Sequence, residues 1–154
     1  MLNEIVMWDR SLKVIDAFIL IVCMMVLLSG TVLTAGAANQ RRDCHVCGMW
    51  IDQYEHTRHV VVLKDGRTEH FCSFACASKY IRDNGESIKA AKVADFITKQ
   101  LVDADGAYYL EGSDVPAVMS YISIIAFSTK SSAAVFREEH GGHIITFAEA
   151  LNNL

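Results

Sequence analysis

Four cysteines in two pairs are the residues of this sequence best suited to chemistry. Two residues stand between Cys44 and Cys47 in the stretch DCHVCGM, and three stand between Cys72 and Cys76 in HFCSFAC. Such short spacings let both sulfurs of a pair face one point, so each pair is able to supply two ligands to one ion. Met49 follows the first pair, and its thioether is a soft ligand that suits Cu(I) better than zinc.

The residue types leave four interpretations of these pairs open. Exported domains are often held together by disulfides, and four cysteines also form structural zinc sites. A thioredoxin-like redox pair should open a helix after a strand, and no helical pattern comes after DCHVCGM. A soft-metal site is favoured, because further soft or borderline ligands occur at His45, His70 and Met119. Cu(I) is therefore the expected metal, with zinc as the alternative.

The second cysteine pair is expected at the start of a helix. In SFACASKYIRDNG, Ser73 is a suitable N-cap, the apolar residues recur at helical spacing, and Asn84-Gly85 ends the pattern. The dipole and the free N–H groups of a helix N-terminus favour thiolates. This helix is therefore expected to position Cys72 and Cys76 for metal binding.

Strands are expected around this helix. RHVVVL (58–63) is rich in β-branched residues, Asp65-Gly66 supplies a turn, and TEHF (68–71) continues as a second strand. The other expected elements are strands at 92–97 and 107–112 with a turn between them, a central strand at 122–127, a capped helix within 128–142, a last strand at 143–147 and a frayed turn at 148–154.

The sequence also contains an internal repeat. FCSFACASKYIRDNG aligns with FSTKSSAAVFREEHG, 56 residues further along, and both read as strand end, cap, helix and glycine. We interpret this as two related β-β-α units in one α+β domain. Cys72 and Cys76 correspond to Ser128 and Ser132 in the second copy, so metal chemistry is expected in one half only.

An apolar segment precedes the cysteine-bearing part. Residues 17–33 carry no charge, and the apolar and small-residue run continues to residue 38, which is 22 residues and long enough to span a bilayer. It is expected to be an uncleaved anchor in the membrane through residues 14–38, or a secretory signal. A buried hairpin is the alternative. We therefore divide the chain into a segment 1–38 and a metal-binding domain 39–154.

The charge of the domain argues against nucleic acid as a partner. Residues 39–154 carry 12 basic and 15 acidic side chains, with no basic stripe. Because an N-terminal apolar segment favours export of the domain behind it, this domain is expected at the cell membrane on the extracytoplasmic (periplasmic) side, or soluble in the periplasm if the segment is cleaved. No catalytic acid–base constellation is visible, and we predict that the protein is not an enzyme.

Taken in order, these motifs resemble the NosL family, exported copper-binding accessory proteins of nitrous oxide reductase. The resemblance covers about residues 43–151. It rests on CHVCGM, the KDG turn, HFCSFAC, YYLEGSD, a lone methionine before an apolar strand, IAFSTKSSAAVFREEHGG and the closing ITFAEAL. It implies an α+β fold of two related units, and a Cu(I) site on Cys47 and Met49 with Met119 near it. It also implies delivery of copper to nitrous oxide reductase through a membrane-associated maturation complex.

Two departures from the family pattern shape the expected site and anchor. Gly36 stands where family members carry a lipid-bearing cysteine, so anchoring by the N-terminal helix is expected instead of lipidation. The other departure is the additional thiols. The expected ligands are Cys47 and Met49, closed by Met119 or His70, with further thiolates from Cys44, Cys72 and Cys76.

The expected function is therefore a membrane-tethered Cu(I) chaperone that passes its ion to a copper-accepting protein by ligand exchange. A structural or sensing zinc module and a thiol oxidoreductase are the alternatives.

Overall fold

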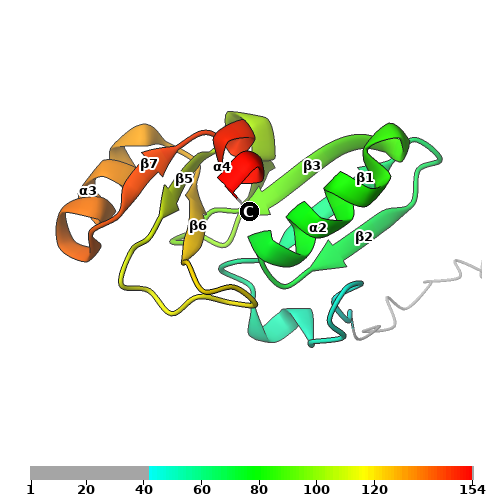
Figure 1. Ribbon diagram of the computed structural model, residues 1–154, viewed down its shortest axis with the longest axis horizontal. Helices are drawn as coiled ribbons and strands as arrows, with labels where there is room; N and C mark the ends of the chain where they lie inside the picture. The colour runs from blue at the N-terminus through cyan, green and yellow to red at the C-terminus, as the bar shows by residue number, and fades with distance from the viewer. Residues whose placement is uncertain (1–41, 154) are drawn as a thin grey trace, which may run out of the picture. The chain divides into compact units, whose positions relative to one another are not determined.

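The computed structural model describes residues 42–153, whose framework is two sheets of antiparallel strands (Figure 1). They belong to one compact unit, Gln40–Leu154. The anchor or signal segment expected at 1–38 lies outside the described residues. Among residues 42–153, no helix is both long enough and apolar enough to cross a membrane.

The first sheet has the strand order β2-β1-β3-β4. Its strands are β1 (His59–Leu63), β2 (Thr68–Phe71), β3 (Ile88–Ala94) and β4 (Leu101–Asp103). Helix α2 (Phe74–Asn84) connects β2 to β3 and buries Phe74 and Ala77. The predicted strands at 58–63 and 68–71 and the predicted helix at 73–85 are confirmed to within a residue or two.

The second sheet has the order β6-β5-β7. It contains β5 (Tyr108–Glu111), β6 (Ile124–Phe127) and β7 (His143–Ile145), with helix α3 (Lys130–His140) between β6 and β7. Helix α4 (Phe147–Asn153) ends the described chain. Three short 3-10 turns, η1 (Ile51–Gln53), η2 (Gly85–Ser87) and η3 (Ala104–Gly106), complete the elements.

The two halves share one topology. In each, the first two strands form an antiparallel hairpin, a helix comes next, and a third strand returns to pair with the first. Each half is therefore a ββαβ unit with its first strand in the centre, one strand more than the β-β-α repeat that the sequence suggests. The expected mixture of helices and sheets in an α+β domain is confirmed.

The apolar sequence of β6 predicted a central strand, and this prediction was wrong. The strand lies at an edge of its sheet, and β5 takes the central position. All four residues of β6 are nevertheless buried. The residues that follow β3 cover the free edge of β6. Asp95 forms a β-bridge with Ala126, and Phe96 N–H donates to Ala126 O at 2.8 Å.

Two further expectations were wrong, each for a local reason. The strand expected at 92–97 ends at Ala94, because the Asp95 carboxylate accepts hydrogen bonds from Ile97 N–H and Thr98 N–H and turns the chain there. Of the stretch 101–106, where a turn is expected, the first half forms β4 and only the second half, which contains Asp105-Gly106, forms the turn η3. The expected frayed terminus is helix α4. Thr146 and Glu149 cap it reciprocally, each backbone N–H donating to the other side chain.

Candidate metal centre

The fold brings the four cysteines of the first unit together. Their four sulfurs lie within 4.8 Å of one another. Cys72 Sγ lies 3.5 Å from Cys47 Sγ and 3.8 Å from Cys76 Sγ. All four are free thiols, with no disulfide among the described residues, and Cys23 lies outside them. Cys44, Cys72 and Cys76 are buried and Cys47 is partly exposed, so the cluster has one accessible thiol.

A tight turn places the first cysteine pair. Gly48 N–H donates to Cys44 O at 2.8 Å, and Cys44 N–H donates to Met49 O at 2.8 Å, which closes the loop on itself. Gly48 has φ +73°, a conformation that costs other residues free energy but not glycine. The glycine of the C-G-M stretch is therefore required by the turn that aims both sulfurs inward.

His45, between the two cysteines, fastens this turn to the rest of the unit. Its backbone N–H donates to His70 O at 2.9 Å, and its Nδ1 lies 2.9 Å from Glu69 Oε2. The ring packs edge-on against Tyr80, with centroids 5.0 Å apart. These contacts give His45 a structural role, and it is not part of the thiol group.

The start of α2 places the second pair. Cys72 precedes the N-cap Ser73, and Cys76 lies in the first turn. The Ser73 side chain makes no capping hydrogen bond and accepts from the Cys72 thiol at 3.9 Å instead. Because no side chain caps this helix end, its positive end faces the sulfurs and favours thiolates there.

The thiols perturb one another's acidity. A hydrogen bond from the Cys72 thiol lowers the pKa of Cys76 to about 6, and the same bond raises the pKa of Cys72. Burial raises the pKa of Cys47, partly offset by a hydrogen bond from Met49 N–H. The cluster thus already holds one sulfur that ionises readily, and a soft cation favours ionisation of the others.

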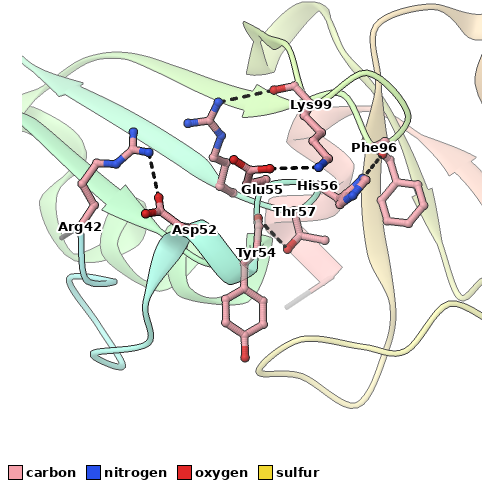
Figure 2. A network of polar contacts seen from close by, with 9 residues as sticks. Arg42, Asp52, Tyr54, Glu55, His56, Thr57, Phe96 and Lys99 are labelled. Atoms are coloured by element: carbon pink, nitrogen blue, oxygen red, sulfur yellow. Dashed lines mark hydrogen bonds and ion pairs between the residues drawn. The ribbon is translucent and has the colours of Figure 1, made fainter. Parts of the chain in front are cut away.

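Polar contacts hold the segment after the cysteine turn in place (Figure 2). The Arg42 guanidinium donates to Asp52 Oδ1 at 2.9 Å, and Lys99 Nζ donates to Glu55 Oε2 at 3.0 Å. Thr57, in the same segment, donates through Oγ1 to Cys72 O at 2.7 Å. The segment therefore connects the two cysteine pairs directly. Thr57 was not predictable from the sequence, since a lone threonine in a loop carries no sign of a contact with a cysteine 15 residues away.

Met49 lies beside the thiol cluster. It is partly buried and packs against the group of buried side chains that contains Cys44, Cys72 and Cys76. That position is compatible with a fifth sulfur ligand and also with simple packing.

Met119 and His70 are placed differently from the thiols. Met119 is 49% exposed, in the loop between β5 and β6, and its neighbour Val118 is the residue that packs against the thiol-bearing cluster. The His70 imidazole is not part of the thiol group, its Nδ1 is buried without a hydrogen-bond partner, and burial lowers its pKa. Val118, a loop valine, was missed because nothing local marks its contact with the first unit.

The geometry suits one soft cation. Four sulfurs bonded at about 2.3 Å to a tetrahedral ion lie about 3.8 Å apart, and three around a trigonal ion lie about 4.0 Å apart. The separations of 3.5 and 3.8 Å are close to both values. Thiolates select Cu(I) and zinc over hard cations such as Mg²⁺ and Ca²⁺.

Comparison with known proteins points to copper. The NosL family model matches residues 35–153. The copper-binding lipoprotein NosL of Stutzerimonas stutzeri is 31% identical over 121 residues, covering 70% of this chain and 60% of that protein. The HTH-type transcriptional repressor CutR of Bacillus subtilis (strain 168) is 25% identical over 111 residues, covering 72% of this chain and 57% of that protein.

One solved structure extends the likeness to the fold. The crystal structure of the copper chaperone NosL from Shewanella denitrificans matches with a TM-score of 0.64 at 25% identity, covering 75% of this chain and 93% of that one. The chain spans only about 60% of the length of the curated relatives it matches. The names of both NosL relatives refer to copper, and neither is the name of an enzyme.

Proposed function

This chain belongs to the NosL family, and we propose that it is an exported, membrane-tethered Cu(I) chaperone that delivers copper to a cuproenzyme such as nitrous oxide reductase. The observation that carries the proposal is the convergence of four thiols, three buried and one partly exposed, at one point of the first unit. Such a donor set retains a soft ion and leaves one sulfur within reach of solvent.

The proposed mechanism is ligand exchange. Cys47 is the accessible thiol, so an acceptor's soft ligand meets the ion there first, while Cys44, Cys72 and Cys76 hold it from the buried side. Met49 lies on the same turn as Cys47 and is proposed as the uncharged ligand that stays competent when protons compete for thiolates. Copper is cargo in this scheme, and the protein catalyses no bond-making or bond-breaking in a substrate.

The membrane part of the proposal rests on the sequence and on one relative. The S. stutzeri protein is named as a lipoprotein. Here Gly36 occupies the place of the lipid-bearing cysteine, so residues 14–38 are proposed to tether the domain to the membrane with the thiols on the extracytoplasmic side.

A competitive Cu(I) titration tests the proposal. The domain 39–154, reduced and anaerobic, is titrated against a chromophoric Cu(I) chelator, with a parallel zinc titration. We expect tight Cu(I) binding and weaker zinc binding. Met49→Leu is expected to preserve the fold and to weaken Cu(I) retention by roughly 10-fold or more, since Leu replaces Met at similar volume without a sulfur. Met119→Leu is the matched control; if Met49→Leu retained copper equally well, Met49 would be a packing residue.

A zinc-holding structural or sensing module is the second candidate. The 3.5 and 3.8 Å sulfur separations approach those of a closed tetrahedral four-thiolate zinc site, and one relative is named as a transcriptional repressor. This candidate predicts that zinc binds at least as well as Cu(I) and that removing the metal unfolds the domain. The same titration, combined with circular dichroism, separates the two.

A further inference from the structure

A shallow groove lies between helix α2 and the loop that joins β5 to β6. Figure 1 shows this loop of the second unit extending toward the start of α2 in the first. The groove measures about 340 Å³, and its lining includes Ala75, Lys79 and Arg82 of α2 and Met119, Tyr121 and Ile122 of the loop.

The loop holds large apolar side chains in solvent. Tyr121 is fully exposed, at 107% of its reference area, and Met119 and Ile122 are 49% and 45% exposed. Met119 also has φ +60°, a backbone conformation that is unfavourable for a residue with a side chain. Strain and exposed apolar area together are unfavourable for the isolated protein, and such features concentrate at sites of interaction.

The charge on this groove is of one sign. Lys79 and Arg82 are its only charged lining residues, and neither forms an ion pair with any residue from 42 to 153. This is notable in a chain of formal net charge −4. Two unpaired cations beside exposed apolar side chains fit a partner surface that is acidic at its rim and apolar at its centre.

Both walls of the groove belong to elements that also contribute to the thiol-bearing core. Cys76 lies on the same helix as Lys79 and Arg82, directly after the lining residue Ala75. On the other wall, Val118 packs against the thiol-bearing core while Met119, the next residue, faces the groove. A partner seated here touches both elements that enclose the cysteines.

We propose that this groove is the docking surface for the copper-accepting protein, which presents an acidic, apolar patch to it. The inference rests on the proposed function and names where its acceptor binds. A protein is favoured over a membrane, because the groove is concave and offers only two cations, fewer than the clusters of about four to eight that are typical of segments that bind anionic lipid surfaces. Exposed aromatic side chains beside a hollow are typical of the centre of protein interfaces.

The test compares copper transfer to two acceptors. The Cu(I)-loaded domain 39–154 is mixed anaerobically with apo nitrous oxide reductase or with a chromophoric Cu(I) chelator, and both rates are measured against ionic strength. The variants are Lys79→Glu/Arg82→Glu and Tyr121→Ser/Ile122→Ser. The control is Lys89→Glu/Lys92→Glu, which reverses two exposed charges on β3, away from the groove.

We expect both groove variants to slow transfer to the enzyme by at least 10-fold, with a flatter salt dependence for the charge reversal, and to leave transfer to the chelator and the Cu(I) affinity unchanged. The control pair should leave both rates unchanged. Three results would overturn the inference: equal transfer to the enzyme by the groove variants, equal slowing by the control pair, or slower transfer to the chelator as well, which would place the effect at the metal site.

Two further outcomes separate the inference from the proposed function. If the wild-type domain binds Cu(I) tightly but transfers none to the enzyme, the docking inference fails while copper binding stands. If it binds no Cu(I), the proposed function fails first. Binding of the wild type, but not of Tyr121→Ser/Ile122→Ser, to vesicles of phosphatidylglycerol and phosphatidylethanolamine would assign the groove to a membrane surface and overturn the protein partner.

Discussion

The two ββαβ units share one topology but differ at the start of the helix and in the connection between the first two strands. Both place the first strand between the other two and run a helix of 11 residues before the third. At the start of the helix, the first unit carries Cys72 and Cys76, and the second carries Ser128 and Ser132. Between its first two strands the first unit has a tight turn, whereas the second has the long loop that contains Val118 and Met119.

These differences give the two units different roles. The first leaves its helix end without a side-chain cap and fills the space before it with thiols. In the second, Thr129 Oγ1 accepts from Ser132 N–H at 3.2 Å, and the buried Asp95 carboxylate accepts from Ser128 N–H at 2.7 Å. The same scaffold therefore supports a metal site in one copy, and in the other a satisfied helix end that joins the sheets.

Removing the thiols of the first unit should have the largest effect. Cys72→Ser/Cys76→Ser is expected to lower Cu(I) affinity at least about 100-fold, because losing ligands costs more than the 10–100-fold typical of residues that only support ligands. Anaerobic competition with a Cu(I) chelator measures it. The corresponding pair Ser128→Ala/Ser132→Ala should leave the affinity unchanged, and a comparable loss in that pair would mean that the site extends into the second unit.

Asp95 should be the most important polar residue for joining the units. Burial alone would raise its pKa, but hydrogen bonds from the Ser128 and Thr98 N–H groups lower it to about 2, from an ordinary 3.8. Because the pKa is lower in the folded state, the ionised carboxylate stabilises the fold at pH values above the pKa of the unfolded state. This contribution, about 2.5 kcal/mol, is lost as the pH falls from about 4 to about 2.

Urea unfolding of the metal-free domain at pH 6 and pH 2.5 measures this contribution. Asp95→Asn should be less stable than wild type by about 2–3 kcal/mol at pH 6, with the gap narrowing at pH 2.5. Asp103→Asn, at the exposed last residue of β4, is the control. A gap that stayed constant with pH would rule out the ionised carboxylate as the cause.

Two glycines with similar φ angles, one in each unit, allow a comparison with a smaller expected effect. Gly48 and Gly141 have φ +73° and +71°, and an added Cβ meets nothing within 4 Å at either position. Alanine at Gly48 should cost about 1–2 kcal/mol of stability through backbone strain. At Gly141, where ψ is −166° and the backbone lies in a region almost exclusive to glycine, alanine should cost about 1–3 kcal/mol. Only Gly48→Ala should also weaken Cu(I) binding, since Gly48 shapes the turn of Cys44 and Cys47. Chelator competition and urea unfolding on both variants check this, and equal copper affinities would show that the turn tolerates the change.

The helix caps should give the smallest difference. Thr129→Ala should destabilise the domain by about 1 kcal/mol because it removes a capping hydrogen bond. Ser73→Ala should cost less than half of that, since Ser73 makes no such bond. Thermal unfolding of the metal-free protein compares them, and a larger loss from Ser73→Ala would reveal a cap that forms in solution.

Much of the secondary structure was predictable from local sequence patterns. The strands β1 and β2 and the helices α2 and α3 are predictable from β-branched runs, an Asp-Gly turn, cap residues and terminal glycines, all of which act within a few residues. Helix α4 was missed although Thr146 and Glu149 carry a capping-box signature, because Thr146 and Phe147 were assigned to the preceding strand. The edge position of β6 had no local signal at all, since an apolar run is equally compatible with a central strand.

The soft ligands, their pairing and the helix that carries the second pair follow from residue types, because spacing and cap chemistry are local. That the two pairs meet is a result of the fold, since 24 residues separate Cys47 from Cys72 and the pairing of β1 with β2 brings these distant residues together. The fold also packed Val118 against the buried core that contains Cys44, Cys72 and Cys76, and left Met119 49% exposed. That placement depends on how a loop of the second unit packs on the first, a long-range contact that no local pattern encodes.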